Sequence, residues 1–355
     1  MDNTIFDIAI IGAGPAGTNF ARLIDTDKYK VLLIDGSDGH DKVCGGLISP
    51  DAQDILARYD ICLPKDILVS PQLFSVRTID LTNNLVNHYR RNYLNVDRKK
   101  LDDFFRSLIP SDIEKISGRC KKVTDNGDFY EIELVSGEMI RSKYVIGADG
   151  ASSNLRLSLF KNKYLMKYVA IQQWFTAGDM NPYYSCIFDN ETSSGCSWIF
   201  FKDGMLIFGG AFDIKNCREA FEEQKRKLVE KGFVEEVVFS NPQKTEACLV
   251  SRPKLKGGIF RGKNRAFLIG EAAGFISPSS FEGISYALYS SEMLADAFNS
   301  SNVNNAAKIM RKYRNTTKKL SAKIKLRCVK RPFMYNKHLR AAVMKSGLTS
   351  IKIKT

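Results

Sequence analysis

The fold is decided near the N-terminus, by the stretch Phe6-Asp7-Ile8-Ala9-Ile10-Ile11-Gly12-Ala13-Gly14-Pro15-Ala16-Gly17. Residues 6–11 are mostly apolar, which is typical of a strand buried on both faces of a parallel sheet. Residues 15–25 predict a helix, and residues 31–34 predict a second strand. Because strand, helix and strand together have the size of a βαβ unit, the sequence predicts an α/β protein with a parallel sheet.

Three glycines follow the first strand at the spacing Gly-x-Gly-x-x-Gly. Gly12 permits a tight turn, Gly14 lets the backbone approach a pyrophosphate, and Gly17 lets the helix pack closely on the strand. The start of the helix then offers unpaired N–H groups to phosphates, and Asp35, 18 residues after Gly17, is placed to accept ribose hydroxyls. The predicted nucleotide contacts of this unit are Gly12, Gly14, Pro15, Ala16, Gly17, Asp35 and Gly36.

Two further short elements follow buried strands later in the chain. Asp149 and Gly150 end one such strand, although an Ala-Asp-Gly sequence alone is commonly just a turn. The sequence Gly-Glu-Ala-Ala-Gly over residues 270–274 precedes a helix predicted over residues 283–298, so that Glu271 could bind a ribityl chain and the helix start could face a flavin ring. The three elements in this order predict a flavin-nucleotide site. They add the contacts Asp149, Gly150, Gly270, Glu271, Ala273, Gly274, Gly283 and Ile284.

The same elements resemble a known superfamily. Gly-x-Gly-Pro-x-Gly over residues 12–17, Ala-Asp-Gly over 148–150 and Gly-x-Ala-Ala-Gly over 270–274 are similar to the aromatic-hydroxylase-type flavoproteins. Within that superfamily, Cys-Gly-Gly-Leu over 44–47 and Trp-x-Phe over 198–200 resemble the geranylgeranyl reductase branch. The resemblance runs from residue 5 to about residue 350 and is most detailed with the bacterial CbrA-type flavoproteins, through residues 44–53, 168–175, 184–190 and 270–288.

The resemblance implies FAD as the cofactor and the reduction of isolated double bonds in isoprenoid chains as the activity. The cofactor contacts that it adds are Cys44, Gly45, Gly46 and Arg98. Arg98 matches the family's position for an arginine that touches the FAD phosphate or ribose, and a solvated arginine at a helix start is the alternative. The chain departs from the wider pattern at Glu271, where the superfamily usually has Asp, and at Phe201, where geranylgeranyl reductases usually have Pro.

Short strands with polar turns between residues 168 and 212 predict an antiparallel sheet that is separate from the first one. We therefore expect a Rossmann-type FAD-binding domain interleaved with an antiparallel-sheet substrate domain of α+β type. The predicted division assigns residues 1–60, 97–160 and 262–300 to the FAD-binding domain, 61–96 and 161–261 to the substrate domain, and 301–355 to a basic helical C-terminal segment.

The reduction of an isolated alkene places a demand on the protein. Such an alkene is a poor hydride acceptor, so a proton donor must lie close to the flavin N5 atom. Cys44 is the catalytic candidate, because the resemblance places its Cys-Gly-Gly turn against the flavin ring. The alternative is that Cys44 is a small buried residue before a Gly-Gly turn.

An isoprenoid chain needs an apolar tunnel. Trp198 and Phe200 fall on one face of a strand by period-two alternation, and Trp174 lies in another strand of the same region. Ordinary packing between a sheet and its helices is the alternative for each of them. The candidate substrate contacts are Trp174, Trp198, Phe200, Gly209 and Gly210.

The net charge of +14 arises in the C-terminal part of the chain. Residues 1–296 carry 37 basic and 39 acidic side chains, whereas 16 basic and no acidic residues follow, all between Lys308 and Lys354. Because apolar residues are interspersed among them, we expect peripheral contact between this segment and an anionic membrane that holds the lipid substrate. A solvated basic helix is the alternative. No nucleic-acid recognition motif accompanies the charge, so no nucleic acid is expected as a partner.

Eight cysteines and three histidines are scattered without a Cys-x-x-Cys pair or a zinc-site spacing, which predicts reduced thiols and no metal site. The start of the chain lacks a signal-peptide pattern, and no apolar run approaches the roughly 20 residues that span a bilayer. These features predict a cytoplasmic location, with peripheral contact to the inner membrane face. One dinucleotide fingerprint is present, so a ferredoxin, a flavodoxin and NAD(P)H all remain open as electron donor.

Two other functions remain open. An FAD-dependent monooxygenase of a hydrophobic substrate would use the same three nucleotide elements, whereas the Cys-Gly-Gly and Trp-x-Phe sequences favour reduction. A flavin halogenase is disfavoured, because no Trp-x-Trp-x-Ile-Pro segment occurs. The non-catalytic alternative is a flavoprotein that binds lipid carriers without converting them.

Overall fold

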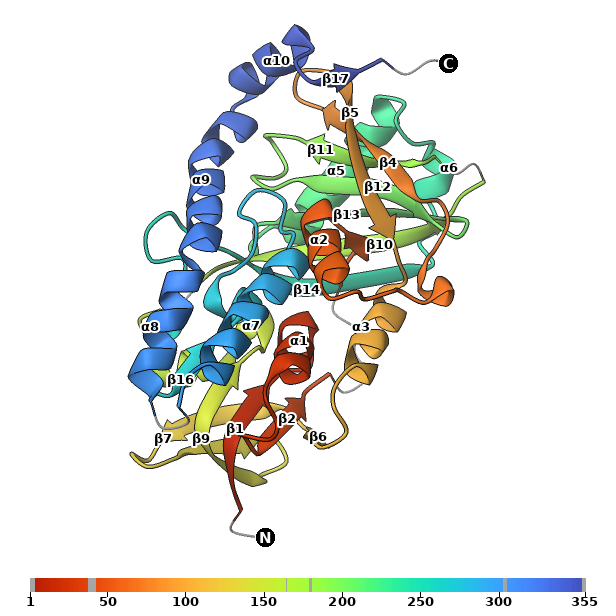
Figure 1. Cartoon of the computed structure of the whole chain (residues 1–355). Coiled ribbons are helices and arrows are strands. Elements are labelled where there is room, and N and C mark those ends of the chain that lie inside the picture. Colours follow the sequence, from red (N-terminus) through yellow and green to blue (C-terminus); the bar gives the residue numbers. More distant parts are fainter. Residues whose placement is uncertain (1–3, 38–42, 164, 179–180, 303–304, 353–355) are drawn as a thin grey trace.

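The computed structural model describes residues 4–37, 43–163, 165–178, 181–302 and 305–352. Its two large sheets lie toward opposite ends of an elongated molecule (Figure 1). The first, eight-stranded sheet pairs β1 (Ile5–Ile11) in parallel with β2 (Val31–Asp35) on one side and with β9 (Met139–Gly147) on the other. Further parallel strands, β16 (Ala266–Leu268) and β6 (Glu114–Ser117), lie beyond β9 and β2. This parallel sheet confirms the predicted α/β class.

The apolar sequence of β1 explains its central place. Ile8, Ala9 and Ile10 are fully buried, as expected for a strand that is covered on both faces. Strand β9 runs without a break and continues the antiparallel hairpin that begins with β8 (Tyr130–Leu134). The antiparallel strands of this sheet are β7 (Cys120–Asp125), β8 (Tyr130–Leu134) and β15 (Gly262–Lys263).

Two helices pack together on the first sheet. The side-chain amide of Asn19 in α1 (Pro15–Leu23) donates to the carbonyl oxygen of Leu288 in α7 (Ile284–Asn299) at 3.1 Å and to the hydroxyl of Ser291 at 2.8 Å. This buried contact joins residues that are about 270 positions apart in the chain. The other helices of this half are α2 (Pro50–Arg58), α3 (Arg98–Ser107) and α4 (Asn154–Leu159).

The second sheet has the strand order β14-β10-β13-β12-β11-β4-β5-β17, with β3 beside β5. Neighbouring strands are antiparallel except for β4 and β11, which are parallel. Its strands are β3 (Leu47–Ile48), β4 (Leu73–Asp80), β5 (Leu85–Asn95), β10 (Met166–Thr176), β11 (Tyr183–Phe188), β12 (Ser197–Lys202), β13 (Met205–Phe212), β14 (Lys244–Arg252) and β17 (Ser350–Ile351). The chain therefore enters this sheet, leaves it to complete most of the first sheet, and returns.

Helices α5 (Cys217–Glu230) and α6 (Glu236–Phe239) cover one face of the second sheet (Figure 1). An aromatic cluster fills that layer, with the ring centroid of Phe208 4.9 Å from that of Phe221 and 5.5 Å from that of Phe239. The opposite face of the sheet is left to line the interior between the two halves of the molecule.

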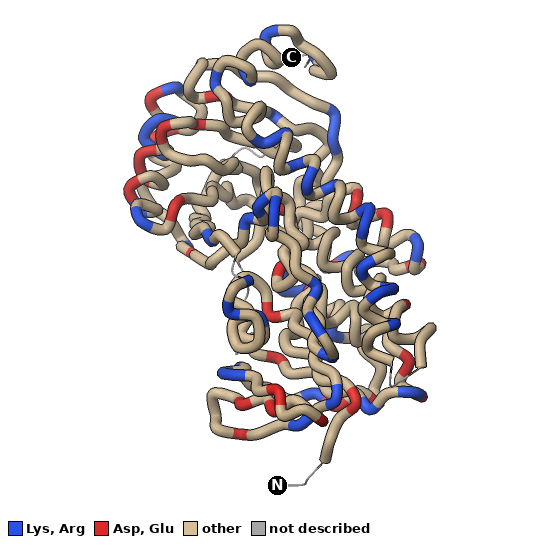
Figure 2. Tube along the Cα trace, turned by 90° about the vertical axis from the view of Figure 1, so that its left-hand side faces the viewer, with Lys and Arg blue, Asp and Glu red and all other residues tan. Residues whose placement is uncertain are grey.

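The basic C-terminal segment is helical, as predicted, but it is not a free tail. It forms α8 (Ala306–Thr316), α9 (Lys318–Tyr335) and α10 (Lys337–Ser346), which run along the side of the molecule from the first sheet to the second (Figures 1 and 2). The hydroxyl of Tyr313 donates to the carbonyl oxygen of Leu268 in the first sheet at 2.9 Å. At the other end β17 pairs with β5. In the described part of the chain, no helix has the length and apolar character needed to cross a bilayer.

A buried ion pair fixes α10 to the second sheet. Arg340 donates from Nε and Nη2 to the two carboxylate oxygens of Asp80 at 2.7 and 2.8 Å, and both side chains are almost completely buried. Burial alone would raise the pKa of Asp80, but the hydrogen bonds from Arg340 and Asn83 outweigh burial and lower it.

We expect Arg340→Ala to lower the free energy of unfolding by about 3–5 kcal/mol, because it leaves a buried carboxylate without its cation. The matched control is Arg226→Ala, which removes an exposed ion pair with Glu223 and should leave the free energy of unfolding nearly unchanged. Urea unfolding measures both. The contribution of Asp80 is present above its ordinary pKa and is lost as pH falls through its lowered pKa, so the wild-type advantage should shrink in acid. Equal losses in the two variants would contradict the assigned role of the pair.

Candidate functional site

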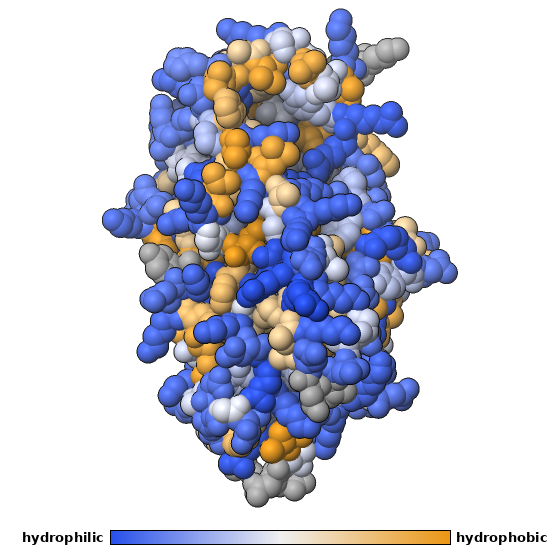
Figure 3. Space-filling model, turned by 60° about the vertical axis from the view of Figure 1, so that its left-hand side comes forward, coloured by the Kyte–Doolittle hydropathy of each residue, from blue (hydrophilic) through white to orange (hydrophobic). Residues whose placement is uncertain are grey.

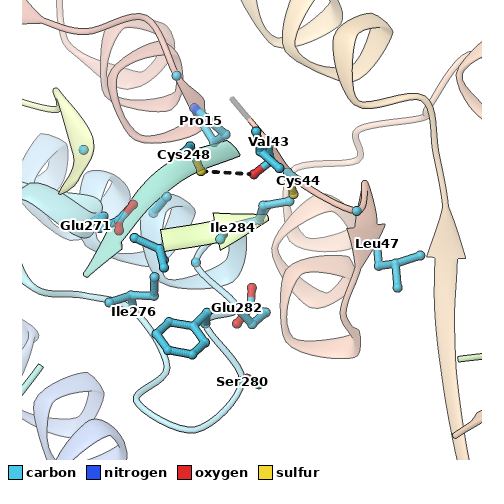
Figure 4. Close-up of a pocket in the computed structure, with 18 of the residues that line it drawn as sticks. Pro15, Val43, Cys44, Leu47, Cys248, Glu271, Ile276, Ser280, Glu282 and Ile284 are labelled. Atoms are coloured by element: carbon cyan, nitrogen blue, oxygen red, sulfur yellow. Dashed lines mark hydrogen bonds between the residues drawn. The ribbon is translucent and has the colours of Figure 1, made fainter. Parts of the chain in front are cut away.

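A cavity of about 1470 Å³ lies between the two sheets and the C-terminal helices. Its wall begins at the β1–α1 turn, passes the Cys44 turn and the inner face of the second sheet, and reaches α9 and α10. Figure 4 shows part of this wall, where Cys248 Sγ lies 3.7 Å from the carbonyl oxygen of Val43. The predicted site residues on the wall are Gly12, Gly14, Pro15, Ala16, Asp35, Gly36, Cys44, Gly45, Arg98, Asp149, Gly150, Trp198, Phe200, Glu271, Gly283 and Ile284.

The three glycines of the β1–α1 turn have different surroundings. A Cβ atom on Gly12, whose φ is +106°, would lie 2.7 Å from the carbonyl oxygen of Ala148, and one on Gly17 would lie 1.8 Å from that of Gly12. A Cβ atom on Gly14 would meet no described atom within 4 Å. Packing therefore requires Gly12 and Gly17, whereas Gly14 leaves open space beside the N-terminus of α1. Such space beside a helix N-terminus fits an approaching phosphate group.

Two carboxylates flank the turn. Asp35 ends β2, where its Oδ1 accepts from the backbone N–H of Ser37 at 3.0 Å and its Oδ2 lies 3.3 Å from Arg106 Nε. Asp149 follows β9, and burial raises the pKa of its carboxyl group. Its Oδ2 accepts from the N–H of Leu155 at 3.3 Å, whereas its buried Oδ1 has no hydrogen-bond partner among the described residues. An orphaned oxygen on the cavity wall fits a polar ligand that donates a hydrogen bond.

The Cys-Gly-Gly turn is held by close packing. A Cβ atom on Gly45 would lie 2.9 Å from the ring of Phe200, and one on Gly46, at φ +63°, would lie 2.3 Å from the carbonyl oxygen of Val96. Gly46 does not line the cavity. The glycines are therefore needed to seat the turn on β12 and the end of β5, and this leaves Cys44 on the cavity wall.

Cations flank the Cys44 thiol. Arg98 is hydrogen-bonded to it and also donates to Asp102 Oδ2 at 2.9 Å. Burial opposes the charge of Arg98, but Cys44 and Asp102 outweigh this effect and raise its pKa. Only 11% of the Arg98 side chain is exposed, so the alternative of a solvated arginine is wrong. Burial also lowers the pKa of the nearby Lys202 to about 8.

Glu271 and its neighbours lie at the start of α7. Glu271 lines the cavity, and its Oε1 accepts from the backbone N–H of Ser251 in β14 at 2.7 Å, so the carboxylate ties the two halves of the molecule together. Gly270, Ala273 and Gly274 are buried behind the wall and do not line it. A Cβ atom on Gly270 would lie 2.9 Å from that of Ala16, so this glycine allows α1 to approach.

Three of the predicted substrate contacts lie away from the cavity wall. Trp174 donates from Nε1 to Glu246 at 2.8 Å instead of lining the cavity. Gly209 and Gly210 also lie outside the lining, and a Cβ atom on Gly209 would lie 2.6 Å from the Trp198 ring. Gly209 therefore makes room for Trp198, which does line the cavity together with Phe200.

Several wall residues were missed by the sequence analysis. Glu282 accepts from the backbone N–H of Ser285 at 2.8 Å and from its hydroxyl at 2.7 Å, and burial raises the pKa of Glu282. Figure 4 shows it near Ile284 and on the same cavity wall as Cys44. Glu282 directly precedes Gly283, a predicted cofactor contact, and this position was the one sequence feature that could have indicated it. The other wall residues that were not among the predicted contacts include Tyr93, Tyr184, Cys186, Phe188, Cys196, Ile276, Lys330, Phe333 and Val343.

Comparisons with known proteins identify the relatives of this chain. No protein-family model matches it. Protein CbrA of Escherichia coli O6:H1 is 40% identical over 355 residues, covering 98% of this chain and 94% of the relative, and protein CbrA of E. coli K12 is 39% identical with 98% of each covered.

Solved structures share the fold. A geranylgeranyl bacteriochlorophyll reductase-like protein from Thermoplasma acidophilum superposes with a TM-score of 0.80 at 19% identity, covering 94% of this chain and 88% of the other. PqsL, a probable FAD-dependent monooxygenase from Pseudomonas aeruginosa, gives 0.72 at 13% identity, covering 96% and 100%. HpxO from Klebsiella pneumoniae, solved with FAD and uric acid, gives 0.69 at 16% identity, covering 96% and 93%. The fold is that of FAD-dependent oxidoreductases, and the chain belongs to the CbrA family.

Proposed function

We propose that this chain is an FAD-dependent oxidoreductase that reduces double bonds in an isoprenoid or polyprenyl lipid. The observation that carries the proposal is the single cavity, which begins at the glycine turn of β1 and α1 and continues past Cys44 along an apolar wall to the C-terminal helices. One space therefore holds a nucleotide-type site and room for a long apolar molecule.

The residues at the first sheet fit FAD. Gly14 leaves room for the pyrophosphate at the α1 N-terminus, Asp35 is placed for a ribose, and Asp149 Oδ1 offers an unused acceptor. FAD, when bound, supplies the hydride for such a reduction. The chain carries one dinucleotide fingerprint, so a ferredoxin, a flavodoxin or transiently bound NAD(P)H could each supply the electrons.

The second sheet supplies an apolar wall. Phe200 and Ile276 are buried, and Trp198 stands beside them on the lining. Apolar side chains of this kind would hold an isoprenoid chain and exclude water from the reacting carbons. Two groups on the wall could deliver the proton that alkene reduction needs: the Cys44 thiol and the Glu282 carboxyl, which its raised pKa keeps protonated to higher pH than an exposed glutamate.

The surface around the outer end of the cavity, formed by residues of the segment 308–354, supports a contact with the membrane. Ile309, Tyr313 and Ile324 pack into the core, so these apolar side chains of the first half of the segment are not available to a membrane. Farther along, α9 and α10 expose large apolar side chains, and Figure 3 shows hydrophobic residues gathered over the upper part of this face. They are Leu326, Val329, Phe333, Met334, Leu339 and Val343, with Leu348 just beyond α10, and the cations among them are Lys325, Lys330, Arg331, Lys337 and Lys345.

This arrangement is the amphipathic, basic surface that binds an anionic bilayer. Phe333 and Val343, 59% and 54% exposed, also line the cavity. A lipid could therefore pass from the bilayer into the cavity without crossing water.

A monooxygenase acting on a hydrophobic substrate is the second candidate. The likeness to PqsL favours it, because the shared fold also serves a probable monooxygenase. A flavoprotein that binds lipid without converting it is the third, and the assays below distinguish the three.

The FAD assignment predicts that Gly14→Val folds normally but loses the cofactor, because the new side chain enters only the space assigned to the pyrophosphate. Gly178→Val, also with open space around its Cβ position, is the matched control and should keep FAD. Flavin absorbance per protein and calorimetric titration of apoprotein measure the affinity, which should fall by at least about tenfold, equal to about 1.4 kcal/mol. Undiminished FAD binding by Gly14→Val would refute the assigned pyrophosphate position.

The reaction is tested with anaerobically reduced protein and geranylgeranyl or longer polyprenyl phosphates, followed by mass spectrometry of the lipid. We expect a gain of two hydrogens per double bond. If Cys44 is the donor, Cys44→Ala should lower the single-turnover rate by about 10²–10⁴-fold with FAD still bound, whereas Glu282→Gln should leave it nearly unchanged. The reverse result would make Glu282 the donor.

A different lipid product would change the assignment. An oxygen atom added under air with NAD(P)H would move the chain to the monooxygenases. Stoichiometric lipid binding without a mass change in any condition would support the non-catalytic alternative.

The membrane contact is tested by flotation with vesicles of anionic and of zwitterionic lipids. The double variant Phe333→Glu and Val343→Glu should lose binding to anionic vesicles, because it removes exposed apolar area and adds negative charge on that face. Val237→Glu, on a valine of α6 that is even more exposed, is the control and should bind as the wild type does. Binding that survives the double variant would place the contact elsewhere.

A further inference from the structure

Two cysteines lie on the cavity wall, one within β11 and the other directly before β12. Cys186 in β11 is the register partner of Trp198 in β12, and Cys196 lies two positions before that tryptophan. Because side chains alternate along a strand, Cys186, Cys196 and Trp198 project from the same face of the sheet. All three line the cavity.

The two thiols interact with each other across the strand pair. Cys186 donates a hydrogen bond to the sulfur of Cys196, which is also hydrogen-bonded to the hydroxyl of Tyr335 at the end of α9. Diagonal neighbours on adjacent antiparallel strands lie within reach of each other's side chains. A disulfide, whose S–S bond is about 2.05 Å long, requires the two side chains to turn toward each other across this diagonal pair, with a small movement of the backbone.

The two sulfurs differ in their electrostatics. The hydrogen bond from Cys186 lowers the pKa of Cys196, and the nearby cation Arg252 acts in the same direction against burial. The same hydrogen bond, together with burial, raises the pKa of Cys186. The thiolate is the nucleophile in cysteine chemistry. We therefore assign the first attack, on the oxidant, to Cys196, and the second attack, on the oxidised Cys196 sulfur, to Cys186.

We propose that Cys186 and Cys196 form a reversible disulfide when hydrogen peroxide enters the cavity. The thiolate of Cys196 attacks one peroxide oxygen, so an S–O bond forms, the O–O bond breaks and the departing hydroxide takes a proton to become water. Cys186 then attacks the sulfenic acid sulfur of Cys196, so the S–S bond forms and the S–O bond breaks, with release of a second water. The two sulfurs lose two electrons in total, and the two peroxide oxygens gain them.

The disulfide would change the outer end of the cavity. Tyr335 packs against Phe188 of β11 with ring centroids 5.3 Å apart and donates to the carbonyl oxygen of Ser279 at 2.7 Å. A disulfide changes the charge and the hydrogen bonding of the Cys196 sulfur, which interacts with the Tyr335 hydroxyl. Oxidation would therefore alter a contact between the end of α9 and the cavity wall. The proposal needs neither FAD nor a lipid substrate, so it can fail or succeed independently of the proposed function.

The experiment treats the reduced, full-length protein with hydrogen peroxide, alkylates the remaining thiols under denaturing conditions, and maps the peptides. Trypsin does not separate the two cysteines, because no Lys or Arg lies between them, but cleavage after Glu191 does. We expect a loss of two hydrogens, one cross-linked pair of peptides containing Cys186 and Cys196, and reversal by dithiothreitol.

Variants separate the two steps. Cys186→Ser should stop at a sulfenic acid on Cys196 that dimedone traps, whereas Cys196→Ser should lose oxidation of Cys186. Cys62→Ser, at an exposed cysteine outside the cavity lining, is the control and should still form the disulfide. Separate oxygenation of the two cysteines, a cross-link between another pair, or no reaction of either in the wild type would overturn the proposal. The peptide map of the wild-type protein shows whether the Cys186–Cys196 disulfide forms, even where a variant fails to fold.

Discussion

The contact between Gly17 and the carbonyl oxygen of Gly12 is the constraint on which the rest of the structure depends. A side chain on Gly17 would place its Cβ atom 1.8 Å from that oxygen, so α1 can lie against β1 only because the residue is glycine. This contact directs the N-terminus of α1 into the cavity and lets α7 pack behind α1 through Asn19. The same approach brings the turn at Ala148 within contact of Gly12. The nucleotide-type end of the cavity is therefore a consequence of backbone packing.

The sequence predicted those parts of the molecule in which the signal is local. The first βαβ unit and the helix after residue 283 were found because apolar periodicity and glycine spacing act over a few residues. The pair Arg340–Asp80 and the carboxylate of Glu282 were not found, because their roles arise from contacts across the fold. Trp174 shows the opposite error: its strand was predicted, but its indole bonds to Glu246 instead of lining the cavity.

The cavity changes character along its length, and each part is supplied by a different segment of the chain. Backbone N–H groups and carboxylates surround the end at the first sheet, while aromatic and aliphatic side chains of the second sheet surround the middle. Exposed apolar residues and cations of α9 and α10 surround the outer end. Such an order suits a molecule that is polar at one end of the site and apolar beyond it. The sequence showed that the positive charge lies in the C-terminal segment. The structure adds that part of this charge lies at the outer end of the cavity.

The pairing of β17 with β5 has a consequence for biosynthesis. Ser350 pairs with Tyr89, so more than 250 residues must leave the ribosome before this edge of the second sheet is covered. Until then β5 presents unpaired backbone groups, and exposed strand edges of this kind are templates for aggregation. The side chains Arg90 and Arg91 on that strand would repel a second copy of the nascent chain during the wait. Because β17 pairs late, the positive charge on β5 would reduce aggregation of the nascent chain during translation.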